Sequence, residues 1–144
     1  MLVYFLGEAE KDGLKETYKI AKKNNLEVIN LLNLKYEKFY TVDPAEFVSL
    51  FANASLIMTD SFHGTIFSII FEKPFIAYKR EQMNSRIDSL LKMFNLNERK
   101  IENIAKENYF EINYDRKSII LKQEREKSFN YLKTAIEEVI KNES

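Results

Sequence analysis

The only histidine of the chain lies in the segment Thr59–Ile70 (TDSFHGTIFSII), where an apolar run gives way to a helical pattern. Before it, Ser55–Met58 (SLIM) is typical of a buried strand, and apolar residues at helical spacing follow Gly64. The first turn of a helix offers unpaired N–H groups and a partial positive charge, which suit a phosphate. The segment therefore predicts a phosphate site where a strand ends and a helix begins.

The side chains of this segment fit such a ligand, although each also has a purely structural interpretation. The hydroxyls of Ser61 and Thr65 can donate hydrogen bonds, and Gly64 lets a ligand approach the backbone. The imidazole of His63 can donate to a phosphate oxygen or exchange a proton near neutral pH. Alternatively, Asp60 or Ser61 only caps the helix, and Gly64 only serves helix–strand packing. The residues alone leave both interpretations open.

Composition excludes several classes of protein. The chain has 144 residues, a formal net charge of zero, no cysteine, and 45% hydrophobic residues. These values suit a soluble globular domain with no electrostatic attraction to nucleic acid, and they rule out disulfides and thiolate metal sites. No metal-ligand cluster is visible. Apolar runs such as Met1–Leu6 are too short to span a bilayer and lack signal-peptide features, so we expect a cytoplasmic protein without a membrane span.

Strand and helix patterns alternate along the chain, without repeats or low-complexity linkers. Strands are expected at Leu2–Gly7, Glu27–Leu32, Ser55–Asp60 and Pro74–Tyr78. Helices are expected from Asp12 to Asn24, from Asp43 to about Ala54, around Ile66–Phe71 until Pro74, at Met83–Phe94 and at about 115–141, with Tyr36–Val42 as a long connection. This order implies right-handed crossovers and predicts an α/β fold, a Rossmann-like open parallel sheet with helices on both faces.

Local patterns make more detailed predictions. Asp43–Glu46 (DPAE) has an acidic cap followed by proline, which marks a helix start. Leu14, Tyr18 and Ala21 are expected on the buried face of the first helix, and Phe110–Tyr114 is expected to be a short edge strand or an extended arm. The closing helix is expected to carry an apolar stripe of Phe129, Leu132, Ile136 and Val139.

The segment Ala54–Tyr78 resembles the signature segment of the polysaccharide pyruvyl transferase family. In that family a strand ending in a Thr-Asp pair precedes a His-Gly helix start, an apolar helix and a Lys-Pro strand. Asn84–Ile101 is similar to the family's arginine-containing helix, and Arg125–Ile136 is similar to its closing helix. Leu2–Glu8 and Asp43–Ala54 also fit. The resemblance covers nearly the whole chain, but only the C-terminal half of a typical member.

The resemblance implies a fold like the C-terminal domain of B-type glycosyltransferases, with residues 1–144 as one donor-binding domain. The implied donor is phosphoenolpyruvate, with no other cofactor, and the product is a pyruvate ketal on a cell-surface or exopolysaccharide glycan. His63 would contact the phosphate and serve as the acid, and Gly64 and Thr65 would supply N–H groups. The N-terminal acceptor domain is absent, so we expect this chain alone to be inactive without that domain or a partner chain.

One departure from the family concerns the charge that holds the phosphate. Many members carry arginine two positions before the histidine, where this chain has Ser61, which brings no charge. Arg86 is the first candidate to replace it, and Lys79 and Arg80 are secondary candidates together with Asp60. Each of the three cations also has an ordinary interpretation as a surface residue.

Three other functions remain open. A sugar-nucleotide donor domain of another glycosyltransferase would use the same crevice for a diphosphate. A receiver-like signalling module would use Asp60 as phospho-acceptor and Lys79 as its partner, but Gly7–Glu10 (GEAE) lacks the acid pair that holds magnesium there. A non-catalytic binding domain is favoured by Ser61 and by the missing half. Neither GxGxxG nor GxxxxGK[ST] occurs, so no nucleotide-binding fingerprint is present.

Overall fold

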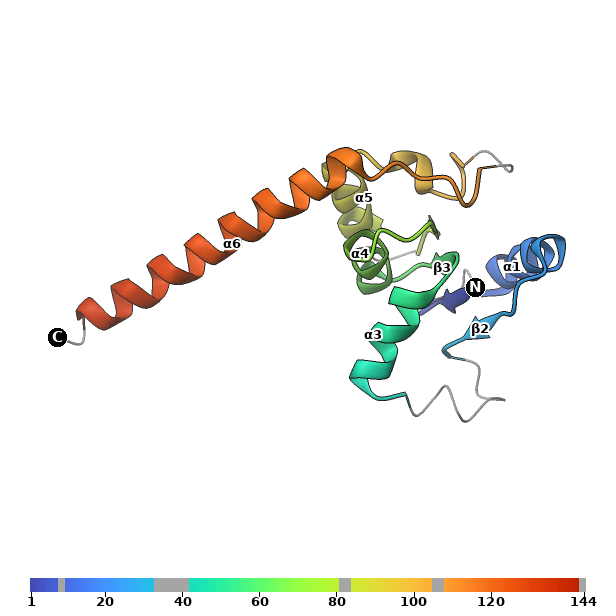
Figure 1. Cartoon of the computed structure of the whole chain (residues 1–144), viewed down its shortest axis with the longest axis horizontal. Coiled ribbons are helices and arrows are strands. Elements are labelled where there is room, and N and C mark those ends of the chain that lie inside the picture. Colours follow the sequence, from blue (N-terminus) through green and yellow to red (C-terminus); the bar gives the residue numbers. More distant parts are fainter. Residues whose placement is uncertain (8–9, 33–41, 81–83, 105–107, 143–144) are drawn as a thin grey trace. The chain divides into compact units, whose positions relative to one another are not determined.

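The computed structural model describes residues 1–7, 10–32, 42–80, 84–104 and 108–142, which form two compact units (Figure 1). The first unit is Met1–Ile112 and the second is Asn113–Ser144, and each is described by itself. The first unit contains β1 (Leu2–Tyr4), α1 (Glu10–Asn24), β2 (Ile29–Asn30), α3 (Pro44–Asn53), β3 (Ile57–Thr59), α4 (Phe62–Ile70), β4 (Phe75–Ala77), α5 (Asn84–Met93) and the 3₁₀ helix η1 (Asn97–Arg99). The second unit contains α6 (Asp115–Asn142). That residues 1–144 form a single donor-binding domain stays a prediction.

The four strands form one parallel sheet in the order β2-β1-β3-β4, which confirms the predicted open parallel sheet. Leu2 of β1 is in register with Ile29 on one side and with Ile57 on the other. β2 therefore lies on one side of β1, and β3 and β4 lie on the other side. The switch point of the topology lies between β1 and β3. In open α/β sheets, ligands bind beyond the carboxyl ends of the strands at such a point.

Helices cover both faces of the sheet, as predicted. α1 packs on one face, where Ile20 and Ala21 join a buried cluster with alternate strand residues, among them Val3, Met58 and Ile76. α3 and α4 cover the other face. There, the ring of Tyr4 meets the rings of Phe47 and Phe51 edge-on, with centroids 5.2 and 6.0 Å apart.

Helix ends follow the local sequence. The carboxylate of Asp43 accepts a hydrogen bond of 2.8 Å from the backbone N–H of Glu46, and Pro44 occupies the first turn of α3, which confirms the predicted start. Asn25 follows α1 and Asn95 follows α5, with φ angles of 52° and 54°. Asparagine tolerates this left-handed region better than most residues, so it ends helices well.

The buried face of α1 differs from the prediction at one residue. Tyr18 is 52% exposed, whereas Thr17 is fully buried, and the helix begins at Glu10 rather than Asp12. The turn at Gly13 faces the sheet, because a Cβ there would lie only 2.6 Å from the ring of Phe5. Small residues thus form much of the contact face, and a search for apolar residues at helical spacing does not detect them.

The segment Phe110–Tyr114 contains no strand, so the edge-strand alternative is wrong. The start of this segment and the residues before it are instead held by Arg99, which is 2% exposed and whose Nε donates to the carbonyl of Phe75 at 2.8 Å. Its terminal nitrogens donate to three further carbonyls, those of Asn108 (3.2 Å), Tyr109 (2.7 Å) and Glu111 (3.1 Å). A side chain therefore binds this segment to the sheet, instead of a strand ladder.

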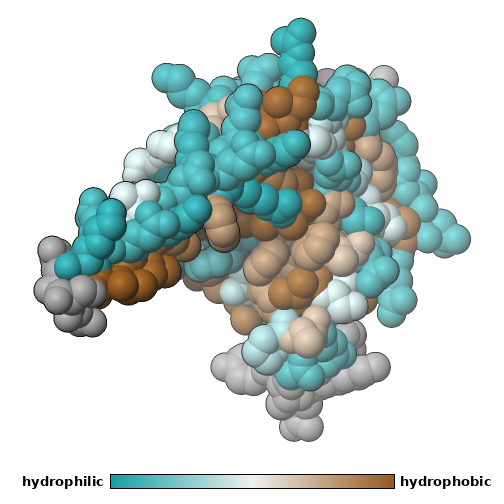
Figure 2. All heavy atoms as spheres, turned by 60° about the vertical axis from the view of Figure 1, so that its left-hand side comes forward, coloured by the Kyte–Doolittle hydropathy of each residue, from teal (hydrophilic) through white to brown (hydrophobic). Residues whose placement is uncertain are grey.

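Some predictions concern residues at the end of the chain or outside the described part. α6 confirms the closing helix, and Figure 2 shows hydrophobic side chains along one side of it and hydrophilic ones along the other. Most of Tyr36–Val42 lies outside the described residues, as does Met83. Within the described part of the chain, no helix has both the length and the hydrophobicity that a membrane span requires.

Candidate functional site

The predicted phosphate segment lies at the switch point of the sheet. Asp60 and Ser61 directly follow β3, and α4 begins at the next residue, Phe62. Gly7 follows β1 and Arg80 follows β4, so the ends of three parallel strands reach the same edge. The fold thus gathers Asp60, Ser61, Gly7 and the start of α4 where ligands bind in this class of sheet.

Asp60 holds the turn after β1 in place. Its side chain is buried and accepts hydrogen bonds from the backbone N–H groups of Leu6 (2.6 Å) and Gly7 (2.9 Å). The pKa of Tyr4 is raised, first by burial and then by the charge of this carboxylate. Asp60 therefore holds the turn after β1 beside the end of β3, and it does not cap α4.

Gly7 makes room for two charged side chains. A Cβ at Gly7 would lie 3.1 Å from Oδ2 of Asp60, and 3.1 and 3.2 Å from Cγ and Nε of Arg80. The arginine side chain therefore lies across the glycine, beside the acid. This places Arg80 at the switch point of the sheet, beside the turn that follows β1.

Ser61 is the N-cap of α4. Its Oγ accepts from the N–H of Gly64 at 3.4 Å, and its carbonyl accepts from both the N–H (2.9 Å) and the Oγ1 (3.0 Å) of Thr65. Both hydroxyl side chains are buried. The N–H of Thr65 is thus used within the helix, and the N–H groups of Phe62 and His63 are the ones that a first turn leaves for a ligand.

Gly64 allows α4 to start very close to β3. A Cβ at this position would lie 2.4 Å from Oγ1 of Thr59, a distance that real Cβ atoms do not show. This hydroxyl is itself fixed, because it donates to the carbonyl of Tyr4 (2.7 Å) and accepts from the N–H of Ser61 (3.0 Å). The structure therefore gives Gly64 a packing role that joins β1, β3 and α4.

His63 is the second residue of α4, and its side chain is exposed. Its ring lies beside that of Phe62, with centroids 6.0 Å apart and planes at 79°. The first turn of α4 carries no acidic residue that would neutralise the positive end of the helix. The imidazole and the unpaired first-turn N–H groups thus both belong to the positive end of α4.

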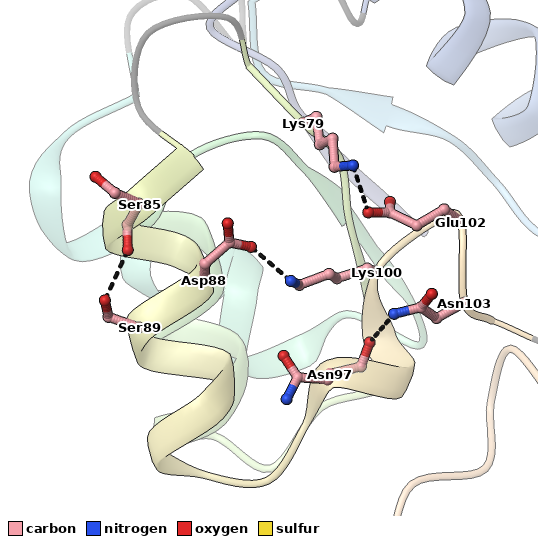
Figure 3. A network of polar contacts seen from close by, with 8 residues as sticks. All are labelled: Lys79, Ser85, Asp88, Ser89, Asn97, Lys100, Glu102 and Asn103. Atoms are coloured by element: carbon pink, nitrogen blue, oxygen red, sulfur yellow. Dashed lines mark hydrogen bonds and ion pairs between the residues drawn. The ribbon is translucent and has the colours of Figure 1, made fainter.

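The three candidate cations have different surroundings. Lys79 forms an ion pair of 2.8 Å with Glu102, which Figure 3 shows beside the pair of Asp88 and Lys100. The hydrogen bond to Glu102 raises the pKa of Lys79, so its charge is already matched within the protein. Arg80 lies across Gly7. Arg86 is different, because its guanidinium carbon lies 4.1 Å from the centre of the Phe62 ring, at the first residue of α4.

The sequence interpretation did not identify Phe62 or Gly7 as parts of the site. Phe62 stands inside the SFHG segment, but its contact with Arg86 joins residues far apart in the chain and leaves no local signal. Gly7 was interpreted only as the end of a strand. Among the described residues, no group of three His, Asp or Glu side chains is placed to hold a metal ion.

Replacing Asp60 by asparagine is expected to destabilise the first unit by roughly 2–3 kcal/mol. Asparagine keeps one acceptor but turns an NH₂ group toward the second backbone N–H, and the charge-assisted bonds are lost. Chemical denaturation followed by circular dichroism measures the change. Asp43→Asn is the matched control, because asparagine caps a helix as well as aspartate does. An equal, small effect of the two substitutions would contradict the positioning role of Asp60.

Comparison with known proteins adds independent support for the resemblance in this region. The family model described as "Polysaccharide pyruvyl transferase" matches residues 2–82, which is more than half of the chain. The match includes all four strands and the whole SFHG segment. Searches of curated proteins and of solved structures found no match. Because the family model covers more than half of the chain, the chain belongs to the polysaccharide pyruvyl transferase family.

Proposed function

We propose that this chain is the donor-binding part of a polysaccharide pyruvyl transferase, which transfers pyruvyl from phosphoenolpyruvate to sugar hydroxyls of a cell-surface or exopolysaccharide glycan. Because phosphoenolpyruvate is a cytoplasmic metabolite, the proposed reaction takes place there. The observation that carries the proposal is the exposed His63 in the first turn of α4, at the switch point of a chain that belongs to this family.

The proposed reaction requires three things of the protein. A proton adds to the enol methylene carbon, which becomes a methyl group, and two sugar hydroxyl oxygens bond to the central carbon. The bond from that carbon to the phosphate oxygen breaks, and inorganic phosphate leaves with the remaining proton. The phosphate must therefore be held, a proton must be delivered, and the hydroxyls must be activated.

The residues at the start of α4 suit the first two of these roles. The N–H groups of Phe62 and His63 and the positive end of α4 stabilise a dianionic phosphate. The imidazole of His63 donates to a phosphate oxygen and is the candidate acid. Ser61, Gly64 and Thr65 act indirectly, because they fix the geometry of this turn. Arg86, whose guanidinium lies over the Phe62 ring, brings to the doubly charged donor a positive charge that Ser61 does not.

Calorimetric titration of the 144-residue chain tests this function without requiring turnover. We expect phosphoenolpyruvate to bind more tightly than inorganic phosphate or a uridine sugar nucleotide. In His63→Ala its affinity should fall by roughly tenfold or more, the value of one hydrogen bond to a charged group. Lys22→Ala is the control, because Lys22 is exposed in the last turn of α1 and far along the chain from the site.

The outcomes separate the candidate functions. Preferential binding of phosphoenolpyruvate that His63→Ala removes would support a pyruvyl-donor domain. Tighter binding of the sugar nucleotide would instead favour a donor domain of another glycosyltransferase. Absence of binding by all three ligands would contradict a donor site in this chain. Pyruvylation of a sugar by the purified chain would overturn our expectation that it binds the donor without transferring it.

A further inference from the structure

A second anion-binding feature lies next to the start of α4. The guanidinium of Arg86, in the first turn of α5, stacks on the ring of Phe62, with its carbon 4.1 Å from the ring centre. A guanidinium that stacks on an aromatic ring keeps its N–H groups available as donors to a ligand. Within the described part of the chain, Arg86 has neither an ion pair nor a hydrogen bond, unlike Lys79 with its partner Glu102.

A hollow of about 350 Å³ adjoins this stacked pair. Its walls are mainly apolar, with two hydroxyl groups on the α5 side, and the lining residues are Phe62, Ser85, Arg86, Ser89, Leu90 and Met93. Figure 3 shows both serines on α5, where Ser89 donates its hydroxyl proton to the carbonyl of Ser85 at 2.8 Å. The volume lies at the lower end of the range for small-molecule sites, so the hollow suits a compact ligand.

The chemistry of these walls selects the class of ligand. The edge of a guanidinium presents two parallel donors that match a carboxylate, and a stacked arginine is held ready in that orientation. The apolar wall accommodates a carbon fragment. Neither α4 nor α5 carries an acid in its first turn that would repel an anion. A small molecule with a carboxylate attached to a short carbon skeleton fits all three features.

We infer that the hollow binds the carboxylate end of the enolpyruvyl donor, with Arg86 as the carboxylate ligand and Phe62 as the ring that holds the guanidinium in position. The inference rests on the proposed function, since it assigns the second charged group of the same donor. The phosphate lies at the first turn of α4 beside His63, and the carboxylate lies beyond the Phe62 ring. Arg86 then determines specificity for the carboxylate and does not act as a general phosphate ligand.

A matched pair of ligands separates the two charges of the donor. Phospholactate and isopropyl phosphate share a phosphate ester and differ only in a carboxylate that replaces a methyl group. Calorimetry on the 144-residue chain should give a preference for phospholactate of at least about tenfold. Arg86→Gln should abolish this preference and leave the affinity for isopropyl phosphate unchanged. His63→Ala should weaken both ligands by the same factor.

Substitutions of Phe62, whose ring lies under the guanidinium, provide a second readout. Phe62→Leu removes the ring and should reduce the preference for phospholactate, whereas Phe62→Tyr keeps the ring and should retain it. If His63→Ala weakens both ligands while Arg86→Gln keeps the preference, the inference is wrong and the proposed function stands. If neither ligand binds the unchanged chain, or if His63→Ala has no effect on either, the proposed function fails and the inference fails with it.

Discussion

Arg99→Met is expected to be the most destabilising single substitution, with a loss of roughly 3–5 kcal/mol in the free energy of unfolding. The arginine is 2% exposed and donates to four backbone carbonyls, one in β4 and three in the segment 108–111. Methionine fills a similar volume but provides no donor, so these carbonyls lose their charged partner. A domain of this size is stable by roughly 5–15 kcal/mol, so the loss is a large share of the total.

Urea denaturation followed by circular dichroism measures this effect. Arg86→Met is the matched control, because it makes the same chemical change at an exposed arginine and removes one cation–π contact worth about 1 kcal/mol. Arg99→Lys keeps the charge with fewer directed donors and should fall between the two, which keeps the test informative if the methionine variant does not fold. Equal effects of Arg99→Met and Arg86→Met would contradict the anchoring role.

Gly64→Ala is expected to destabilise the chain by about 3 kcal/mol, the upper end of the range for overpacking a core. The new Cβ would meet Oγ1 of Thr59 at 2.4 Å, and this hydroxyl cannot move away without losing its bonds to Tyr4 and Ser61. Displacement of α4 would also move the first-turn N–H groups. The variant should therefore lose both stability and affinity for phosphoenolpyruvate.

A double-mutant cycle identifies the contact that causes the loss. In a Thr59→Ala background, the Oγ1 and Cγ2 atoms nearest to the new Cβ are absent, and only the Cβ of residue 59 remains at 3.1 Å. Gly64→Ala should then cost about 1 kcal/mol, which gives a coupling energy of about 2 kcal/mol. Additive effects of the two substitutions would show that Gly64 is needed for another reason.

Much of the fold follows from local sequence. The alternation of apolar runs and amphipathic segments predicts the parallel sheet, and Asp43 with Pro44 predicts the start of α3, because capping chemistry is local. Residues that act through distant contacts are not visible in this way. Arg99 stands between Glu98 and Lys100 in a polar stretch typical of a surface, yet it is buried by segments on either side of it.

For the candidate site too, local sequence predicts some features and not others. The position of His63 at a helix start could be predicted, because a strand, a cap and a glycine are consecutive in the sequence. The roles of Ser61 and Gly64 could not be decided, because cap and ligand chemistry use the same residue types. Phe62 became significant only through its contact with Arg86, which depends on how α5 packs against α4. The contacts of the folded chain decide such questions.

The measurement that tests the central claim most directly is a ¹⁵N NMR titration of the unchanged chain with phosphoenolpyruvate. A phosphate at the first turn of α4 should shift the amide signals of Phe62 and His63 most strongly, because these are the N–H groups that the first turn leaves for a ligand. The amide of Thr65, which is bonded within the helix, should move much less. Saturable shifts elsewhere in the chain, with the signals of Phe62 and His63 unmoved, would contradict the proposed site.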